Sequence, residues 1–223
     1  EVNNEIDISG EFTTPVGCKM VIGGFFSYVQ DYITARLLPE SEAKPQTAGV
    51  YGVKQFYNED NVYLYGIEFT YQTNQDWKWG MNMRAAGTWG INQEGTAYII
   101  EKDAVTGTEA IDNDALPEIP PFEGAVELYY RFFKGKLIPA LDLRMVAEQK
   151  NISQAYGEDE TPGFVLLNFN ILYDFNDNLR LTGGVSNIFN KAYYEHLNRR
   201  IIGGKGNLYE PGRIFYLSVY FNI

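Results

Sequence analysis

The chain ends on Arg213-Ile-Phe-Tyr-Leu-Ser-Val-Tyr-Phe-Asn-Ile223, in which apolar and polar side chains alternate. Successive side chains of a β-strand point to opposite faces. One face would therefore carry Phe215, Leu217, Val219, Phe221 and Ile223, and the other Tyr216, Ser218, Tyr220 and Asn222. A wholly apolar face that includes aromatic residues is typical of the lipid-facing side of a transmembrane barrel strand.

The same alternation recurs upstream, most clearly in Val62–Thr73, Phe122–Phe132 and Gly163–Phe175. In each segment one face is apolar and the other carries amides and charges. The pattern predicts an all-β protein. Its expected strands are Asn4–Thr14, Cys18–Leu38, Val62–Thr73, Trp77–Asn92, Phe122–Phe132, Lys136–Lys150, Gly163–Phe175, Leu179–His196 and Arg213–Ile223.

Two kinds of connection alternate between these strands. The short ones are rich in the Gly, Asn, Asp and Pro of tight turns: Pro15-Val-Gly17, Asn74-Gln-Asp76, Lys134–Gly135 and Asn176-Asp-Asn178. The long polar ones are Pro39–Asn61, Gln93–Pro121, Asn151–Pro162 and Leu197–Gly212. In an antiparallel meander the two kinds lie at opposite ends, as in outer-membrane barrels. A soluble β-sandwich is not expected to keep them in strict alternation.

The odd number of expected strands indicates part of a barrel. In a meander the first and ninth strands run the same way, whereas single-chain bacterial barrels have even strand numbers. An open sheet edge in lipid would leave backbone groups unpaired. We therefore expect an antiparallel transmembrane β-barrel of which this chain contributes about nine strands. Either an odd number of further strands lies N-terminal to Glu1, or the count of nine is wrong by one.

Composition narrows the function. The net charge of −11 argues against nucleic-acid binding, which requires a basic surface. No run of about 18 apolar residues predicts a membrane-spanning helix. Cys18 is the only cysteine, so no internal disulfide can form. No signal peptide is recognisable at Glu1, so we expect that it has been removed or that the chain starts inside a longer protein.

The segment Arg180–Asn198 and the terminal strand resemble the C-terminus of TonB-dependent outer-membrane receptors. The matching residues are Gly184, Asn187, Ile188, Phe189, Asn190, Lys191 and Tyr193, followed by Pro211, Gly212 and Arg213. Ile223 departs from the terminal Phe that is usual in the family. Upstream, Tyr65-Gly-Ile-Glu68 resembles another strand of the family.

This resemblance implies a barrel of about 22 strands in the outer membrane of a Gram-negative bacterium, wide enough to hold a globular plug. It implies uptake of a scarce small ligand, such as an iron–siderophore chelate, haem or cobalamin. A TonB-type inner-membrane complex would supply the energy by pulling on the plug. Residues 1–223 would be the C-terminal portion of the barrel, with the plug and the N-terminal strands outside this chain. No cofactor is expected.

The candidate ligand-binding residues follow the family motif. Continuing the alternation from Arg180 places Tyr194 and His196 on the inner face above the membrane. Arg199 and Arg200 come next and suit an anionic chelate. His196 is the only histidine, which is a weak metal signal. The motif itself, Asn187–Tyr193, is either a ligand site or a turn where the strand leaves the membrane, and the residue types favour the turn.

Other polar groups suggest no chemistry. The acidic clusters Asp112/Asp114/Glu118 and Glu158/Asp159/Glu160 could bind Ca²⁺, but they lack the spacing of a calcium loop, which favours solvated loops. No residue is assigned a catalytic role, so the protein is expected not to be an enzyme. The inner face should be hydrated by Glu68, Glu127, Arg131, Arg144, Asn168, Asn170 and Arg180.

Three alternatives remain open beside the receptor. The first is a passive porin or small closed barrel of eight or ten strands, which the odd strand count and the terminal motif disfavour. The second is a membrane-barrel hydrolase with a site at the rim, which would need groups around His196. The third is a soluble all-β adhesin or binding domain, which should stay monodisperse without detergent.

The topology can be tested by labelling intact cells with a membrane-impermeant thiol reagent after Cys18 is replaced. Single cysteines at Ala104, Asn151 and Gly204, in the long loops, should be labelled. Cysteines at Gln75 and Asp177, in the tight turns, should be protected because they lie in the periplasm. Labelling of the second set alone would reverse the topology.

Overall fold

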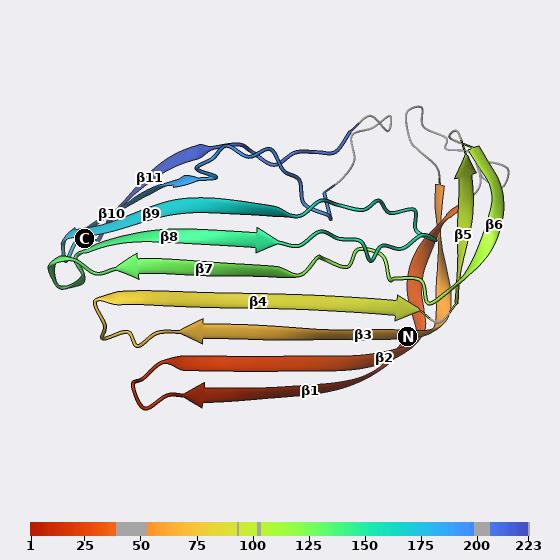
Figure 1. The fold of residues 1–223 in the computed structure, drawn as a ribbon, viewed down its shortest axis with the longest axis horizontal. Helices are drawn as coiled ribbons and strands as arrows, with labels where there is room; N and C mark the ends of the chain where they lie inside the picture. Colours follow the sequence, from red (N-terminus) through yellow and green to blue (C-terminus); the bar gives the residue numbers. More distant parts are fainter. Residues whose placement is uncertain (39–52, 93, 102–103, 199–205, 223) are drawn as a thin grey trace.

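The computed structural model describes residues 1–38, 53–92, 94–101, 104–198 and 206–222, whose regular secondary structure is β-strand apart from one 3₁₀ turn at Phe133–Gly135. Nine strands form one antiparallel sheet (Figure 1): β1 (Val2–Thr13), β2 (Lys19–Leu38), β3 (Val53–Gln72), β4 (Trp79–Asn92), β7 (Glu123–Tyr130), β8 (Leu137–Val146), β9 (Phe164–Asn176), β10 (Leu179–Ser186) and β11 (Ile214–Phe221). Spatial order follows chain order, so the predicted nine-stranded meander is confirmed. Within the described residues, no helix is long and apolar enough to cross a membrane.

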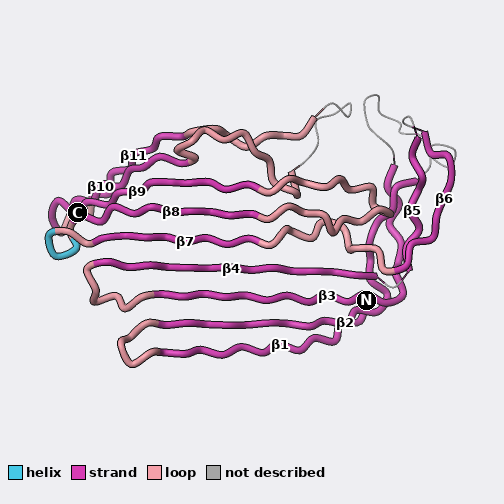
Figure 2. The backbone as a smooth tube through the Cα atoms, in the orientation of Figure 1, coloured by secondary structure: helices cyan, strands magenta, loops and turns pink. Residues whose placement is uncertain are grey.

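The four predicted tight turns lie together at one end of the sheet, and the long connections extend from the other (Figure 2). Hydrogen bonds from side chains to backbone carbonyls connect neighbouring turns. Asn74 donates its side-chain amide to the carbonyl of Val16 at 2.8 Å, and Arg131 donates to the carbonyls of Gln75 and Trp77 at 2.8 and 2.7 Å. Gly17 has a φ of 82°, and a side chain there would collide with Asn74, so this turn requires glycine.

Strand register gives the sheet one continuous apolar face. Directly paired residues share a face, and one row can be followed across seven strands: Phe12, Met20, Tyr71, Met83, Val126, Leu143 and Leu167. A second row on the same face reaches the last strand: Met81, Leu128, Leu141, Phe169, Val185 and Phe215. The row beside the first, on the opposite face, mixes charged, polar and apolar residues: Glu11, Val21, Thr70, Arg84, Ala125, Arg144 and Leu166. We call the apolar side the outer face and the mixed side the inner face.

Aromatic pairs lie near both ends of the strands. The rings of Trp77 and Trp79 lie tilted with their centroids 5.1 Å apart beside the tight turns, and Tyr65 stacks on Trp89 at 5.9 Å towards the long loops. Trp79 and Trp89 are ten residues apart on one strand. At about 3.4 Å per residue and a tilt of about 45°, this separation is roughly 24 Å along the membrane normal. Outer-membrane barrels have an apolar band of about 25 Å between aromatic girdles.

Three predicted boundaries are wrong. The loop Gln93–Pro121 contains a separate two-stranded hairpin, β5 (Glu94–Glu101) and β6 (Ala104–Asp112). β3 begins at Val53, inside the predicted loop Pro39–Asn61. β10 ends at Ser186, ten residues before His196, because Asn187 has a φ of 51° and turns the chain out of the strand.

The long strands β2 and β3 continue past the sheet as a two-stranded arm (Figure 1). The pairing leaves out Asp31, whose φ is 54°, and Asp60 opposite it, and resumes in the same register at Tyr32 with Glu59. A residue in the left-handed region departs from the extended backbone of a strand and bends it. The arm therefore turns away from the sheet at the loop end (Figure 1), as the length of Cys18–Leu38 predicts.

The terminal strand tests the assignment of the two faces. Phe215, Leu217, Val219 and Phe221 lie on the outer face and are 61–75% exposed in the isolated chain, whereas Ile223 lies outside the described residues. Leu217→Arg should cost roughly 2–4 kcal/mol near the bilayer midplane and block stable insertion. Ser218→Arg, one residue along on the inner face, is the matched control. Insertion is measured by heat-modifiable gel mobility of the intact protein, and equal tolerance of both changes would refute the outer face.

Candidate functional site

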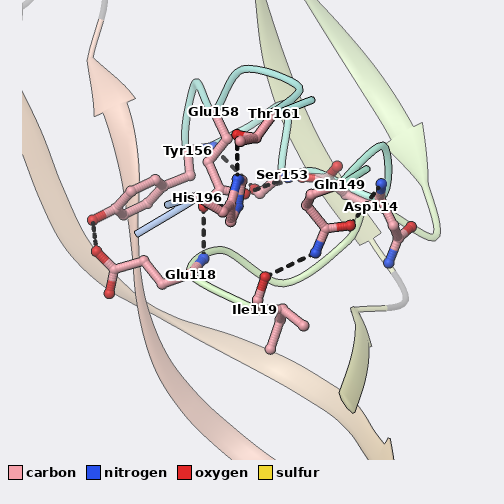
Figure 3. Close-up of polar contacts among 10 residues, drawn as sticks. Asp114, Glu118, Ile119, Gln149, Ser153, Tyr156, Glu158, Thr161 and His196 are labelled. Atoms are coloured by element: carbon pink, nitrogen blue, oxygen red, sulfur yellow. Dashed lines mark hydrogen bonds and ion pairs between the residues drawn. The ribbon is translucent and has the colours of Figure 1, made fainter. Parts of the chain in front are cut away.

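The candidate site is the rim at the loop end of the sheet, where three connections pack together (Figure 3). They are the β6–β7 loop (residues 113–122), the β8–β9 loop (residues 147–163) and the first part of the β10–β11 loop (residues 187–198). Binding residues are often carried on loops that a rigid scaffold holds in place.

Asp114 joins the first two loops. Asp114 is 3% exposed, and its carboxylate accepts three hydrogen bonds from the β8–β9 loop. The donors are the Ser153 hydroxyl at 3.0 Å, the Gln154 amide at 3.0 Å and the Ala155 amide at 3.1 Å. Asp114 therefore caps the turn that begins at Ser153, in the way that a capping residue satisfies free amides.

Glu158 is the point where all three loops meet. Its carboxylate accepts from the Ser153 amide of its own loop at 2.9 Å and from the Glu118 amide of the β6–β7 loop at 2.6 Å. His196 of the β10–β11 loop places its Nε2 3.8 Å from the same carboxylate. The other ring nitrogen of His196 is hydrogen-bonded to Thr161 at 2.9 Å.

Tyr156 extends the network to the arm. Its hydroxyl donates to Glu118 at 2.9 Å, and Lys54 of β3 lies 2.8 Å from the centre of its ring. Partial burial raises the pKa of Tyr156 to about 12, and the hydrogen bond to Glu118 adds to the effect. The phenol therefore remains a neutral donor throughout the physiological pH range.

The β6–β7 loop also folds against the inner face of the sheet. Leu116 and Ile119 are buried on Val29 and Val62 of β2 and β3. Gln149 donates to the Ile119 carbonyl at 2.8 Å. A Cβ at Gly90 would lie 2.6 Å from a methyl of Leu116, so this loop can rest on β4 only because position 90 is glycine.

The predicted ligand-binding residues are only partly brought together. His196 is enclosed, with a side chain 4% exposed, and Tyr194 stacks edge-on against Tyr209 at 5.4 Å. The strand alternation used to place both on the inner face is wrong, because β10 ends at Ser186. Arg199 and Arg200 lie outside the described residues. Ligand contact by these four residues stays a prediction.

The acidic clusters divide between two roles. The sequence favoured solvated loops for both clusters. Asp114 and Glu158 instead serve as hydrogen-bond acceptors between loops, and the Glu158 side chain is only 10% exposed. Glu118 and Glu160 are exposed. Within the described part of the chain, no group of three or more His, Cys, Asp or Glu side chains is arranged to hold a metal ion.

The family motif folds a turn. Asn187 is 4% exposed, and its side chain both accepts from the Lys191 amide and donates to the Lys191 carbonyl, each at 2.8 Å. Asn190 accepts from the Arg213 amide at 2.9 Å, and a Cβ at Gly212 would lie 2.4 Å from the same Asn190 oxygen. Tyr193 packs on Phe164 at 4.5 Å. The motif thus ties the end of β10 to the start of the last strand.

Several charges and amides of the inner face are paired. Arg144 forms ion pairs with Glu123 at 2.8 Å and with Glu195 at 2.6 Å. Other cross-strand pairs include Asn82 with Glu127, Asn168 with Asp142, and Arg180 with Asp174. These contacts stabilise a polar wall, and hydration of the inner face by its polar residues stays a prediction.

An apolar outer face, a polar inner face and interlocked loops at one end together describe part of the wall of a membrane barrel. Family comparison defines it further: residues 19–188 match the family "TonB dependent receptor-like, beta-barrel". The chain belongs to this family, whose members are receptors and transporters of the Gram-negative outer membrane.

Solved structures agree. The copper transporter OprC is 26% identical to this chain, with a TM-score of 0.78 over 98% of this chain and 31% of its own. The FrpB iron transporter from Neisseria meningitidis (F3-3 variant) is 17% identical, with a TM-score of 0.65 over 98% and 30%. The ferric yersiniabactin uptake receptor FyuA from Yersinia pestis is 12% identical, with a TM-score of 0.63 over 98% and 29%. The chain thus spans about a third of the length of these proteins. No curated protein matches it.

The turn role of the motif can be tested at Asn187. Asn187→Ala should remove the buried side chain that pairs both backbone groups of Lys191 and destabilise the intact protein by about 1–3 kcal/mol. Phe189→Ala is the control, because Phe189 belongs to the same motif but is 74% exposed, and it should change stability by no more than about 0.5 kcal/mol. Thermal unfolding in detergent measures both, and equal effects would contradict the turn role.

Proposed function

We propose that this chain is the wall and outer rim of a receptor that takes up a scarce small ligand across the outer membrane of a Gram-negative bacterium. The observation that carries the proposal is the rim of interlocked loops on a sheet with an apolar outer face and a polar inner face. Family membership supports the remainder of the mechanism: the ligand is captured by the loops, a plug rearranges, and a TonB-type complex supplies the energy.

The plug and the other strands would come from outside these 223 residues. The chain covers about 31% of the copper transporter OprC, and β1 and β11 are the two edges of the described sheet. Both edge strands run from the loop end to the turn end. An odd number of further antiparallel strands would close the sheet and satisfy the edge groups that hydrocarbon cannot solvate.

The residue chemistry favours a ligand recognised through oxygen and nitrogen groups. All four methionines (Met20, Met81, Met83 and Met145) lie on the outer face, and Cys18 is buried beside a tight turn. Soft sulfur ligands are what Cu(I) prefers. The described residues therefore offer no sulfur site on the inner wall or rim, although OprC is a copper transporter. We propose an anionic chelate, such as an iron–siderophore complex, as the ligand class.

One arrangement at the rim superficially resembles a hydrolase site. Thr161, His196 and Glu158 present a hydroxyl, an imidazole and a carboxylate in sequence. However, Thr161 is 7% exposed and the His196 side chain 4%, so a substrate could not reach the hydroxyl. A nucleophile must be within reach of the bond that it attacks, and the hydrolase alternative is therefore not supported by this arrangement.

The receptor proposal is tested by changing the rim in the full-length protein. Arg199→Ala with Arg200→Ala, or deletion of Gly203–Gly206, should reduce uptake of an iron-55 chelate several-fold while the barrel still assembles, because ligand capture depends on the outer loops. Lys134→Ala with Lys136→Ala is the charge-matched control at the opposite end of the sheet. A panel of ferric catecholate, ferric citrate and haem probes is used. Unchanged uptake in both rim variants would remove this loop from the site.

A further inference from the structure

We propose that Asp114 and Glu158 form a two-point latch that holds three rim loops together as one preformed surface. The latch itself is a property of the folded protein, and only its use in ligand capture rests on the proposed function. Figure 3 shows both carboxylates between the loops, with their partners around them.

The first point of the latch is a carboxylate that no amide can replace. One oxygen of Asp114 accepts from the Gln154 amide, and the other accepts from the Ser153 hydroxyl and the Ala155 amide. Both oxygens thus face donors. Asparagine would keep one acceptor and turn an NH₂ group towards another donor, so Asp114→Asn should open this contact with little change in side-chain size.

Glu158 is the second point of the latch, and both of its carboxylate oxygens also face donors. One oxygen of Glu158 accepts from the Glu118 amide and the other from the Ser153 amide. Ser153 is shared, because its hydroxyl binds Asp114 and its amide binds Glu158. The two carboxylates are therefore linked through one residue. Groups that share a hydrogen-bonded residue are expected to be energetically coupled.

Polar contacts account for most of the junction between the loops. The two buried apolar clusters near the rim contain Leu116 and Ile119 of the β6–β7 loop, but no residue between 147 and 163. The β8–β9 loop is connected to its neighbours through Asp114, Glu158, Gln149, Tyr156 and Thr161. Hydrogen bonds of this kind can open locally without unfolding of the sheet.

The consequence concerns ligand binding. A rim that is already ordered does not lose conformational entropy when it captures a ligand, and preorganisation increases affinity by removing this cost. Opening the latch would loosen the β8–β9 loop against the β6–β7 loop, although Gln149 and Tyr156 would still connect them, and would leave His196 held by Thr161 alone of the two residues that contact its ring. The latch therefore sets how rigidly the three loops are held relative to one another.

Hydrogen–deuterium exchange of the intact receptor in detergent tests the latch without any ligand. Asp114→Asn and Glu158→Gln should each speed amide exchange roughly fivefold or more in both the 115–121 and 150–161 segments. Asp114 has no described contact with residues 193–198, so faster exchange there in Asp114→Asn would show transmission through Glu158. Glu160→Gln, which changes an exposed carboxylate of the same loop, is the matched control.

Coupling between the segments decides the proposal. If Asp114→Asn speeds exchange in residues 115–121, 150–161 and 193–198 while Glu160→Gln leaves them unchanged, the three loops move as one unit. Exchange that changes only in residues 150–161, or in none of the segments, would overturn the latch. Uptake of iron-55 chelates is measured separately on the wild-type receptor, so failure of the proposed function is distinguishable from failure of the latch.

Discussion

The need to pair every backbone amide and carbonyl in hydrocarbon is the constraint on which this structure depends. Water is absent from the bilayer core, so an unpaired group there costs several kcal/mol. The chain meets this demand inside its sheet with nine antiparallel strands whose spatial order follows their order in the chain, and its two edge strands, β1 and β11, need partners from outside. Because side chains alternate with a period of two, this register also assigns each residue to one face. Hydrogen bonding and the separation of apolar from polar surface are thus two consequences of one pairing pattern.

The backbone is held by different interactions at the rim and in the wall. In the wall, alternating apolar side chains and ladder hydrogen bonds fix the backbone, and polar groups are confined to one face. At the rim, backbone amides leave the ladder and need other acceptors. Asp114 and Glu158 supply them, each to residues some 40 positions away in sequence. A wall held by regular pairing therefore carries loops held by a small number of side chains, which allows the loops to differ between family members on a common barrel.

Sequence alone predicts the wall well because alternation and turn residues are local signals. The nine strands and four tight turns follow from them. It extends β10 too far, to His196, although the residue types of Asn187–Tyr193 favoured a turn there, and Asn187 in the left-handed region ends the strand. It misses the β5–β6 hairpin, whose segment is acidic and has no continuous apolar face. It also misses the role of Asp114, because its partners at Ser153–Ala155 come from a distant loop that no local pattern identifies.

The membrane assignment is most directly tested by a nitroxide scan along β9, residues 165–173, in the intact receptor reconstituted into lipid bilayers. Collision with oxygen, which concentrates in lipid, is compared with collision with a water-soluble nickel chelate. Labels at Leu167, Phe169 and Ile171 should collide with oxygen and be shielded from nickel, whereas labels at Asn168 and Asn170 should collide less with oxygen, giving a period of two. Nickel access at Phe169 and Ile171, or no alternation along the strand, would contradict the assignment of this sheet to a membrane wall.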